Sequence, residues 1–214
     1  MTRFCIFDLD GTLVNSLEDL ADATNRALRM QGFPEHPYDA YRQFVGDGVL
    51  LLLRRAAPQG CTQEQLDTLK LEFDRWYGTH SFDKTRAYDG CAELLRELEK
   101  RRVLTAVLSN KPDEFVGEIV RRYFPEAHFT AVYGKRPQYE KKPDPAALNE
   151  MIRECGVKKE ECLYIGDSNV DVYTAHNAQV RCCGALWGFR GQKELEEAGA
   201  DCLASAPNDI LKLL

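Results

Sequence analysis

The stretch that most constrains the fold of this chain lies at its beginning. Four apolar residues, Phe4–Phe7, run directly into the segment Asp8–Thr12, which reads D-L-D-G-T. An uninterrupted apolar run rich in β-favouring residues is typical of a short strand that is buried on both faces of a parallel sheet. Asp8 and Asp10 are two positions apart, so their side chains point the same way if the backbone is still extended there. Gly11 then allows a sharp turn.

Two carboxylates held side by side repel each other, and a divalent cation is the simplest way to offset that repulsion. Because Mg²⁺ prefers oxygen ligands, it is the cofactor that we expect at Asp8 and Asp10. Solvated, turn-forming aspartates are the simpler alternative, and this stretch alone leaves that alternative open. A calcium-binding EF-hand loop also begins D-x-D, but it needs glycine at its sixth position, where this chain has Leu13. The calcium-loop interpretation is therefore excluded.

The composition argues against several other classes of protein. The 214 residues include 28 Lys and Arg against 34 Asp and Glu, a net charge of -6, and no sustained basic run, so nucleic-acid binding is not expected. No apolar run approaches membrane-spanning length, and the first strand follows Met1 too closely to leave room for a signal peptide. The eight cysteines are scattered without a C-x-x-C pair, which indicates buried thiols rather than zinc ligands or disulfides. We therefore expect a cytoplasmic protein with no membrane partner.

A change of periodicity along the chain predicts two domains. Helical spacing begins after Ser16, a candidate N-cap with Asp19 three residues on, and no strand pattern interrupts residues 16–82. Beyond residue 83, helices alternate with strands, which implies βαβ units and a parallel sheet. The prediction is an α/β protein with a Rossmann-like parallel sheet core (1–15 and 83–214) and an inserted all-helical domain (16–82). Helices are expected from Ser16 to Gly32, at 38–45, 48–57, 62–80, 90–101, 113–123 and 143–155, directly after the segment 166–171, and at 207–213. Strands are expected at 103–108, 128–133, 162–165, 180–186 and 201–204.

Polar and acidic side chains stand at the ends of three of the predicted strands. In open α/β sheets, ligands bind beyond the carboxyl ends of the strands, so these side chains are expected to meet there. They supply carboxylates for a metal, a hydroxyl, an amide and a cation, which are the groups needed to hold a phosphoryl group and neutralise its charge. The strand-end residues are Asp8, Asp10, Ser109, Asn110, Asp167 and Asp171, and the cation is Lys142, which precedes the proline-opened helix between the last two of these strands.

Four short motifs occur in one order along the chain: D-x-D-G-T at 8–12, S-N at 109–110, K-P at 142–143 and G-D-x-x-x-D at 166–171. In this order and at these strand ends, they resemble the phosphatase branch of the haloacid dehalogenase superfamily over essentially the whole chain. The helical insert resembles that family's cap, and its segment 44–56 is similar to the cap of phosphoglycolate phosphatases. The resemblance implies a parallel-sheet core whose site is closed by a helical cap.

The resemblance also implies a role for each candidate residue. Asp8 would be the nucleophile that accepts the phosphoryl group, and Asp10 would protonate the leaving group and then take a proton from water. Mg²⁺ would be held by Asp8, the backbone carbonyl of Asp10, and Asp167. Asp171 would orient Lys142 or metal-bound water, although it could equally be a first-turn residue that favours the helix dipole. The remaining groups, which would bind the substrate, are Gly11, Thr12, Ser109, the Asn110 amide and Lys142 in the core, and Gly46 and Gly48 in the cap.

The expected activity is hydrolysis of a small phosphorylated metabolite by a monomer or homodimer, with phosphoglycolate as the leading candidate substrate. The presence of Asp10 argues against assigning this chain to the superfamily's dehalogenases. A leaving alcohol needs a proton, which Asp10 can supply, whereas a leaving halide needs none. A β-phosphoglucomutase-like phosphotransferase is less favoured, since those relatives usually carry Val or Ile in place of Thr12 and a basic residue near Gly48. A pyrophosphatase or nucleotidase of the same branch, and a catalytically silent binding protein on the same fold, stay open as alternatives.

Overall fold

The computed structural model covers residues 1–214, and the chain divides into two compact units. The core unit comprises Met1–Val14 and Ala87–Leu214, and the helical unit comprises Asn15–Arg86. The two segments that connect the units, β2 (Val14–Asn15) and β3 (Arg86–Ala87), form a two-stranded sheet.

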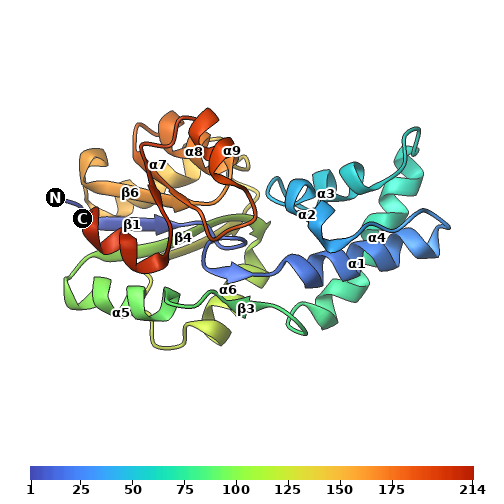
Figure 1. Cartoon of the computed structure of the whole chain (residues 1–214), viewed down its shortest axis with the longest axis horizontal. Helices are drawn as coiled ribbons and strands as arrows, with labels where there is room; N and C mark the ends of the chain where they lie inside the picture. The colour runs from blue at the N-terminus through green and yellow to red at the C-terminus, as the bar shows by residue number, and fades with distance from the viewer. The chain divides into compact units, whose positions relative to one another are not determined.

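The core unit is built on a parallel sheet of six strands in the order β5-β4-β1-β6-β7-β8 (Figure 1). The four residues of β1 are buried, as expected of a run that is apolar on both faces. This central strand lies between β4 and β6, which come from segments about 100 and 160 residues further along the chain. The sheet confirms the predicted Rossmann-like α/β core. Its strands are β1 (Phe4–Phe7), β4 (Leu104–Pro112), β5 (Ala131–Lys135), β6 (Cys162–Gly166), β7 (Arg181–Ala185) and β8 (Cys202–Ala204).

Helices cover both faces of this sheet (Figure 1). On one face, Leu148 of α7, Val172 of α8 and Leu195 of α9 share a buried apolar cluster with Phe4 and Ile6 of β1. The helices α5 and α6 lie against the opposite face. The helices of the core unit are α5 (Cys91–Lys100), α6 (Asp113–Tyr123), α7 (Ala146–Cys155), α8 (Asn169–Asn177) and α9 (Gln192–Glu197), with two short 3₁₀ helices, η1 (Lys159–Glu161) and η2 (Pro207–Lys212).

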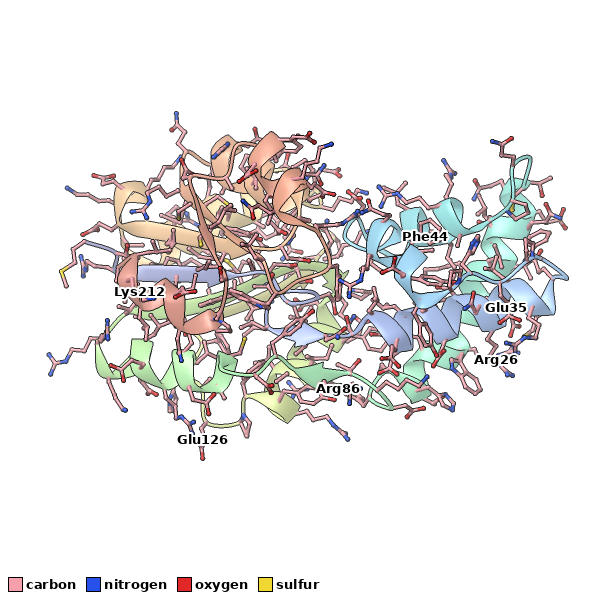
Figure 2. All side chains as sticks on the ribbon, in the orientation of Figure 1. Arg26, Glu35, Phe44, Arg86, Glu126 and Lys212 are labelled. Carbon is pink, nitrogen blue, oxygen red and sulfur yellow. The ribbon has the colours of Figure 1, made fainter.

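The helical unit contains four α-helices, of which α1 and α4 pack along each other. The turn between α2 and α3 contains Gly46 and Gly48, whose φ angles of +122° and +84° lie in the region that favours glycine. Tyr41 is fully buried, and its ring meets that of Phe44, labelled in Figure 2, edge to face with the centroids 5.4 Å apart. The helices are α1 (Leu17–Met30), α2 (Tyr38–Phe44), α3 (Val49–Ala56) and α4 (Gln63–His80).

The start of α1 differs from the predicted capping arrangement. Ser16 occupies the N-cap position, but its side chain makes no capping hydrogen bond. The carboxylate of Asp19 instead accepts hydrogen bonds from the backbone N–H groups of Lys84 and Thr85, at 2.8–3.2 Å, and from the Thr85 hydroxyl at 2.7 Å. These bonds tie residues 83–86 to α1, so the helical unit extends to Arg86 rather than ending at residue 82.

Two elements near the sheet edges also differ from the prediction. The strand expected at 128–133 lies later, at Ala131–Lys135, and it includes Gly134. A Cβ on Gly134 would come within 2.5 Å of the Lys111 carbonyl oxygen, so this glycine permits a close backbone approach that a periodicity argument does not detect. The terminal helix expected at 207–213 is a 3₁₀ helix, η2, with Pro207 at its start. The helix α9 was not predicted.

Acidic and basic side chains are interspersed over the outside of each unit (Figure 2), and many form ion pairs such as Arg29–Glu35 in the helical unit and Arg3–Glu161 in the core unit. All eight cysteines are free thiols. Among the helices of this chain, none combines the length and the apolar character needed to cross a membrane.

Candidate active site

The three central strands of the core sheet are in register where β1 and β6 reach their carboxyl ends, and β4 continues beyond that level to Pro112. Phe7 of β1 is in register with Val107 of β4 and with Ile165 of β6. The next residues along these strands therefore meet at the carboxyl edge of the sheet, where ligands bind in open α/β folds. This register places Asp8, Ser109 and Asp167, which the sequence analysis assigned to separate strand ends, at the same edge.

Lys142 lies at the centre of the buried polar network at this edge. Its Nζ donates to Asp8 Oδ1 at 2.8 Å, to Asp171 Oδ1 at 2.7 Å and to the hydroxyl of Tyr164 at 3.1 Å. Three acceptors match the three N–H donors of a lysine ammonium, so its position is over-determined. The Lys142 side chain is 4 % exposed. The structure thus brings together Asp8, Lys142 and Asp171 as the sequence analysis expected.

Tyr164 is a member of this network that the sequence analysis missed. It lies on β6 and is fully buried, and its hydroxyl lies 3.4 Å from the Leu108 carbonyl oxygen and 3.3 Å from Asp171 Oδ1, either of which can accept its proton. In the sequence it looks like an ordinary aromatic residue of a buried strand. The only available signal was its hydroxyl, which must find a partner when it is buried.

Asp171 combines the two roles between which the sequence analysis left a choice. One carboxylate oxygen accepts from Lys142, and the other accepts from the backbone N–H of Ser168 at 3.1 Å and from its hydroxyl at 2.7 Å. Ser168 and Asp171 thereby form a capping box at the start of α8. Asp171 both caps this helix and orients Lys142.

Asp167 is held tightly by the backbone around it. Its Oδ2 accepts a hydrogen bond from the backbone N–H of Phe189 at 2.7 Å. A Cβ on Gly11, whose φ is +95°, would come within 2.3 Å of this same oxygen, and a Cβ on Gly188 would come within 2.2 Å of the Asp167 Cβ. Glycine is therefore required at both positions for the two loops to close around this carboxylate.

The buried carboxylates fit a divalent cation. Carboxylate oxygens of Asp8, Asp167 and Asp171 lie within 4.8 Å of one another, and all three residues are buried. Burial raises the pKa of Asp8 to about 7, with Lys142 opposing that rise, and burial together with Asp171 and Asp8 raises the pKa of Asp167 well above its usual range. Crowded carboxylates of this kind call for a compensating positive charge. Because both Asp171 oxygens are already engaged, Asp8 and Asp167 are the better-placed ligands.

Ser109 and Asn110 lie beside this network, and Asn110 has a clear structural role. Its side-chain oxygen accepts from the backbone N–H of Lys142 at 2.8 Å, and its side-chain nitrogen donates to the Lys142 carbonyl oxygen at 3.2 Å. The side-chain amide of Asn110 therefore positions Lys142, and the donor role toward a substrate that we expected of Asn110 stays a prediction. The Ser109 hydroxyl accepts from the backbone N–H of Lys111 at 3.3 Å.

Thr12 is buried with an unsatisfied side chain. Its carbonyl oxygen accepts a hydrogen bond from Trp187 Nε1 at 2.9 Å, which fixes the backbone of the turn. Its Oγ1 is buried and has no hydrogen-bond partner in the protein. An orphaned hydroxyl is costly unless a ligand or water satisfies it, so this atom supports the expectation that Thr12 contacts a bound group.

Asp10 has a partner that the sequence analysis did not include. The Nζ of Lys111 lies 3.1 Å from both carboxylate oxygens of Asp10, and the two side chains are 4 % and 13 % exposed. Lys111 directly follows the S-N motif, and its position next to that motif was the only signal in the sequence.

The two cap glycines, Gly46 and Gly48, belong to the helical unit, and their role toward a substrate stays a prediction.

The geometry agrees with the comparisons to known proteins. The sequence profile of the family described as haloacid dehalogenase-like hydrolase matches residues 5–185. A phosphoglycolate phosphatase of Pseudomonas putida is 35% identical over 202 residues, which are 92% of this chain and 74% of that protein. One of Vibrio parahaemolyticus is 33% identical over 218 residues, covering 99% of this chain and 96% of that protein. The crystal structure of a predicted phosphoglycolate phosphatase from Haemophilus somnus superposes with a TM-score of 0.92 at 29% identity, covering 99% of this chain and 97% of that chain.

These findings define an enzyme of the hydrolase class whose candidate site lies at the carboxyl edge of a parallel sheet. The chain belongs to the haloacid dehalogenase-like hydrolase family and, within it, to the phosphatases that resemble phosphoglycolate phosphatase. The family resemblance read from the four motifs is thereby confirmed.

Proposed function

We propose that this protein is a Mg²⁺-dependent phosphomonoester hydrolase that acts through an aspartyl-phosphate on a small phosphorylated metabolite, with phosphoglycolate as the leading candidate. The observation that carries the proposal is the buried triad of Asp8, Lys142 and Asp171, with Asp167 at the same edge. A carboxylate nucleophile, a fixed cation and further carboxylates for a metal are the parts that phosphoryl transfer requires. The named relatives support the choice of substrate.

In the first step, an oxygen of Asp8 forms a bond to the phosphorus while the bond from the phosphorus to the ester oxygen breaks. Asp10 gives its proton to the departing alkoxide. In the second step, Asp10 takes a proton from water, whose oxygen attacks the aspartyl-phosphate and releases inorganic phosphate and free Asp8. The Thr12 and Ser109 hydroxyls and the Asn110 amide donate to the phosphoryl oxygens through both steps. The backbone N–H of Gly11, expected to bind substrate, instead donates to the Val14 carbonyl oxygen at 2.8 Å, so Gly11 shapes the turn rather than donating to the phosphoryl group.

Lys142 remains charged throughout this cycle. Burial alone would lower its pKa, but the carboxylates of Asp171 and Asp8 raise it well above its usual value. Its ammonium therefore offsets the charge of the nucleophile and of the phosphoryl oxygens near it. Asp8, Asp167 and the Asp10 carbonyl would hold Mg²⁺, which supplies the positive charge that lets an anionic phosphate approach an anionic nucleophile.

We place this activity in the cytoplasm, because eight free cysteines, five of them buried, are typical of a reducing compartment. The expected partner is the small phosphorylated substrate, with the protein acting as a monomer or homodimer.

The test is phosphate release by the purified full chain from p-nitrophenyl phosphate and from a panel of phosphorylated metabolites. Activity should depend on Mg²⁺, be lost with EDTA and return when Mg²⁺ is restored. Ca²⁺ should substitute poorly because its larger and more flexible coordination sphere displaces the reacting oxygens. Hydrolysis that survives thorough chelation would contradict the metal dependence, and absence of any hydrolysis with Mg²⁺ present would contradict the proposed function.

A further inference from the structure

We propose that Lys111 selects substrates whose leaving group carries a negative charge, a role that goes beyond the phosphoryl-transfer machinery and rests on the proposed function. The chemical class is a phosphate ester of a short hydroxy acid, in which a carboxylate lies close to the ester oxygen. The observations that carry this inference are the position of the Lys111 ammonium beside Asp10 and the local backbone that fixes it there.

The Lys111 ammonium is a fixed charge at the site. Its Nζ lies 3.1 Å from Asp10 Oδ1 and 3.1 Å from Asp10 Oδ2, so it faces the carboxylate symmetrically. The Lys111 side chain is only 4 % exposed, whereas lysines of folded proteins are ordinarily solvated. The protein therefore keeps a second lysine ammonium at this edge, separate from that of Lys142, which contacts Asp8 and Asp171.

The backbone around Lys111 aims its side chain at the site. Leu108 of β4 is paired with Tyr133 of β5, but Pro112 is paired with Lys135, so β4 has two extra residues in this interval. Such a bulge bends a strand and redirects its side chains. The bulged segment is held on both sides, by the hydrogen bond from the Lys111 N–H to Ser109 Oγ and by the close approach of the Lys111 carbonyl oxygen to Gly134.

The position of Asp10 defines which part of a substrate Lys111 would meet. The proposed acid must lie against the oxygen of the leaving group, because that oxygen receives its proton. A cation in contact with both oxygens of this acid therefore stands on the leaving-group side of the phosphoryl site, and Lys142 stands on the nucleophile side. A carboxylate on the leaving group would be attracted there, whereas a neutral group of the same size would gain nothing from the charge.

Paired substrates test this inference. Phosphate release with Mg²⁺ is measured for 2-phosphoglycolate and for 2-hydroxyethyl phosphate, which replaces the carboxylate with a neutral hydroxymethyl group. For the wild-type protein, we expect kcat/KM for 2-phosphoglycolate to exceed kcat/KM for 2-hydroxyethyl phosphate by about tenfold or more. Lys111→Met should reduce this ratio of the two kcat/KM values by about tenfold, and Lys111→Arg should keep most of it. Lys135→Met is the matched control, because Lys135 is exposed on the neighbouring strand and should leave the ratio unchanged.

If Lys111→Met lowers kcat/KM by the same factor for both substrates, the inference is overturned, because Lys111 then serves only to position Asp10. A wild-type enzyme that does not distinguish the two substrates would overturn it as well. If Lys111→Met does not fold, inhibition of the wild-type protein tests the inference instead. Glycolate should inhibit the hydrolysis of p-nitrophenyl phosphate more strongly than ethylene glycol does. Equal inhibition by the two compounds would overturn the inference. A failure of the proposed function is a separate outcome: neither p-nitrophenyl phosphate nor any phosphorylated metabolite would be hydrolysed with Mg²⁺ present, whatever the substrate ratio.

Discussion

The Nζ of Lys142 lies 2.8 Å from Oδ1 of Asp8, and these residues are separated by 134 positions in the chain. Both side chains are almost completely buried, with 4 % and 10 % of their surfaces exposed. Removing one member of a buried ion pair leaves an uncompensated charge, and this is strongly unfavourable. The contact therefore links the proposed nucleophile to the cation on which its charge depends.

Replacing Asp8 with Asn should give a folded but inactive protein, because the amide keeps the shape of the side chain and cannot act as the nucleophile. We expect kcat for p-nitrophenyl phosphate to fall by about a thousandfold or more. Asp67→Asn on the exposed side of α4 is the control and should retain full activity. Circular dichroism checks the fold, and near-wild-type turnover by Asp8→Asn would rule out covalent catalysis by this residue.

Replacing Asp10 with Asn should harm substrates with poor leaving groups most, because those substrates depend on proton donation. We expect a loss of about a hundredfold or more for an alkyl phosphate and a clearly smaller loss for p-nitrophenyl phosphate, whose phenolate leaves readily. The measurement is kcat/KM for both substrates with the wild-type and variant proteins. Equal losses on the two substrates would show that Asp10 is not the acid.

The affinity for Mg²⁺ should fall as the pH falls. In the metal-free protein, burial raises the pKa of Asp8 to about 7 and raises that of Asp167 well above its usual range. A divalent ion needs both groups ionised, so protons compete with it, and the dissociation constant should rise by up to about tenfold per pH unit for each proton displaced. Calorimetric titrations at pH 8, 7 and 6 measure this effect, and an affinity that is constant over this range would contradict it.

The same shifts predict how the stability of the metal-free protein responds to pH. The folded pKa of Asp8 is higher than its unfolded value of about 4, so its contribution to the free energy of unfolding is fully present below about pH 4. That contribution is lost as the pH rises through about 7. The melting temperature of metal-free protein should therefore fall as the pH rises from about 4 to about 7, and it should fall less in protein saturated with Mg²⁺.

Replacing Tyr164 with Phe should slow turnover without unfolding the protein. The variant removes one of the three acceptors around Lys142 Nζ and leaves the buried ring in place. If removing this hydrogen bond raises the activation free energy by about 1 kcal/mol, a value typical of a buried hydrogen bond, kcat decreases by about fivefold. Tyr133→Phe is the matched control, since its hydroxyl donates to Glu154 rather than to the site. An unchanged kcat in Tyr164→Phe would show that the other two acceptors suffice to position Lys142.

Replacing Gly48 with Leu tests the predicted role of the helical unit in selecting small phosphomonoesters. If the Gly46–Gly48 turn faces the substrate, the variant should raise KM or lower kcat for the best small substrate and leave Mg²⁺ affinity unchanged. The positive φ of Gly48 also strains any larger residue. Gly60→Leu controls for that strain, because Gly60 has the same φ of +84° and nothing within 4 Å of its added Cβ. Equal kinetic effects of both variants would show that the turn is only structural.

Much of the fold could be predicted because its signals are local. The apolar run Phe4–Phe7 indicated a strand buried on both faces, and the change from helical to alternating periodicity separated a helical insert from a parallel sheet. Asp8 and Asp167 could be proposed because each belongs to a motif at a strand end, and one edge of a parallel sheet collects those ends. Lys142 could be proposed because its K-P motif precedes a helix between two such strands.

Lys111, Tyr164 and Asp19 show what a local pattern cannot supply. Lys111 reaches Asp10 because a bulge in β4 redirects the chain, and bulges depend on the pairing of two strands. Tyr164 looks like an ordinary core residue until the register of β6 places its hydroxyl against Lys142. Asp19 looks like part of a capping box until the chain returns 65 residues later and offers it three hydrogen-bond donors.

The sequence by itself determined the class of fold, the order of the motifs and the residue types that the chemistry needs, because periodicity and strand-end chemistry act over a few neighbouring residues. Tertiary structure alone decided which of these groups touch: Lys142 against Asp8, Asp171 and Tyr164, and Lys111 against Asp10. Such contacts join residues 22 to 134 positions apart, and they depend on sheet register, a bulge and helix packing. Hydrogen bonds are directional and short, so a shift of one residue in any of these would break them.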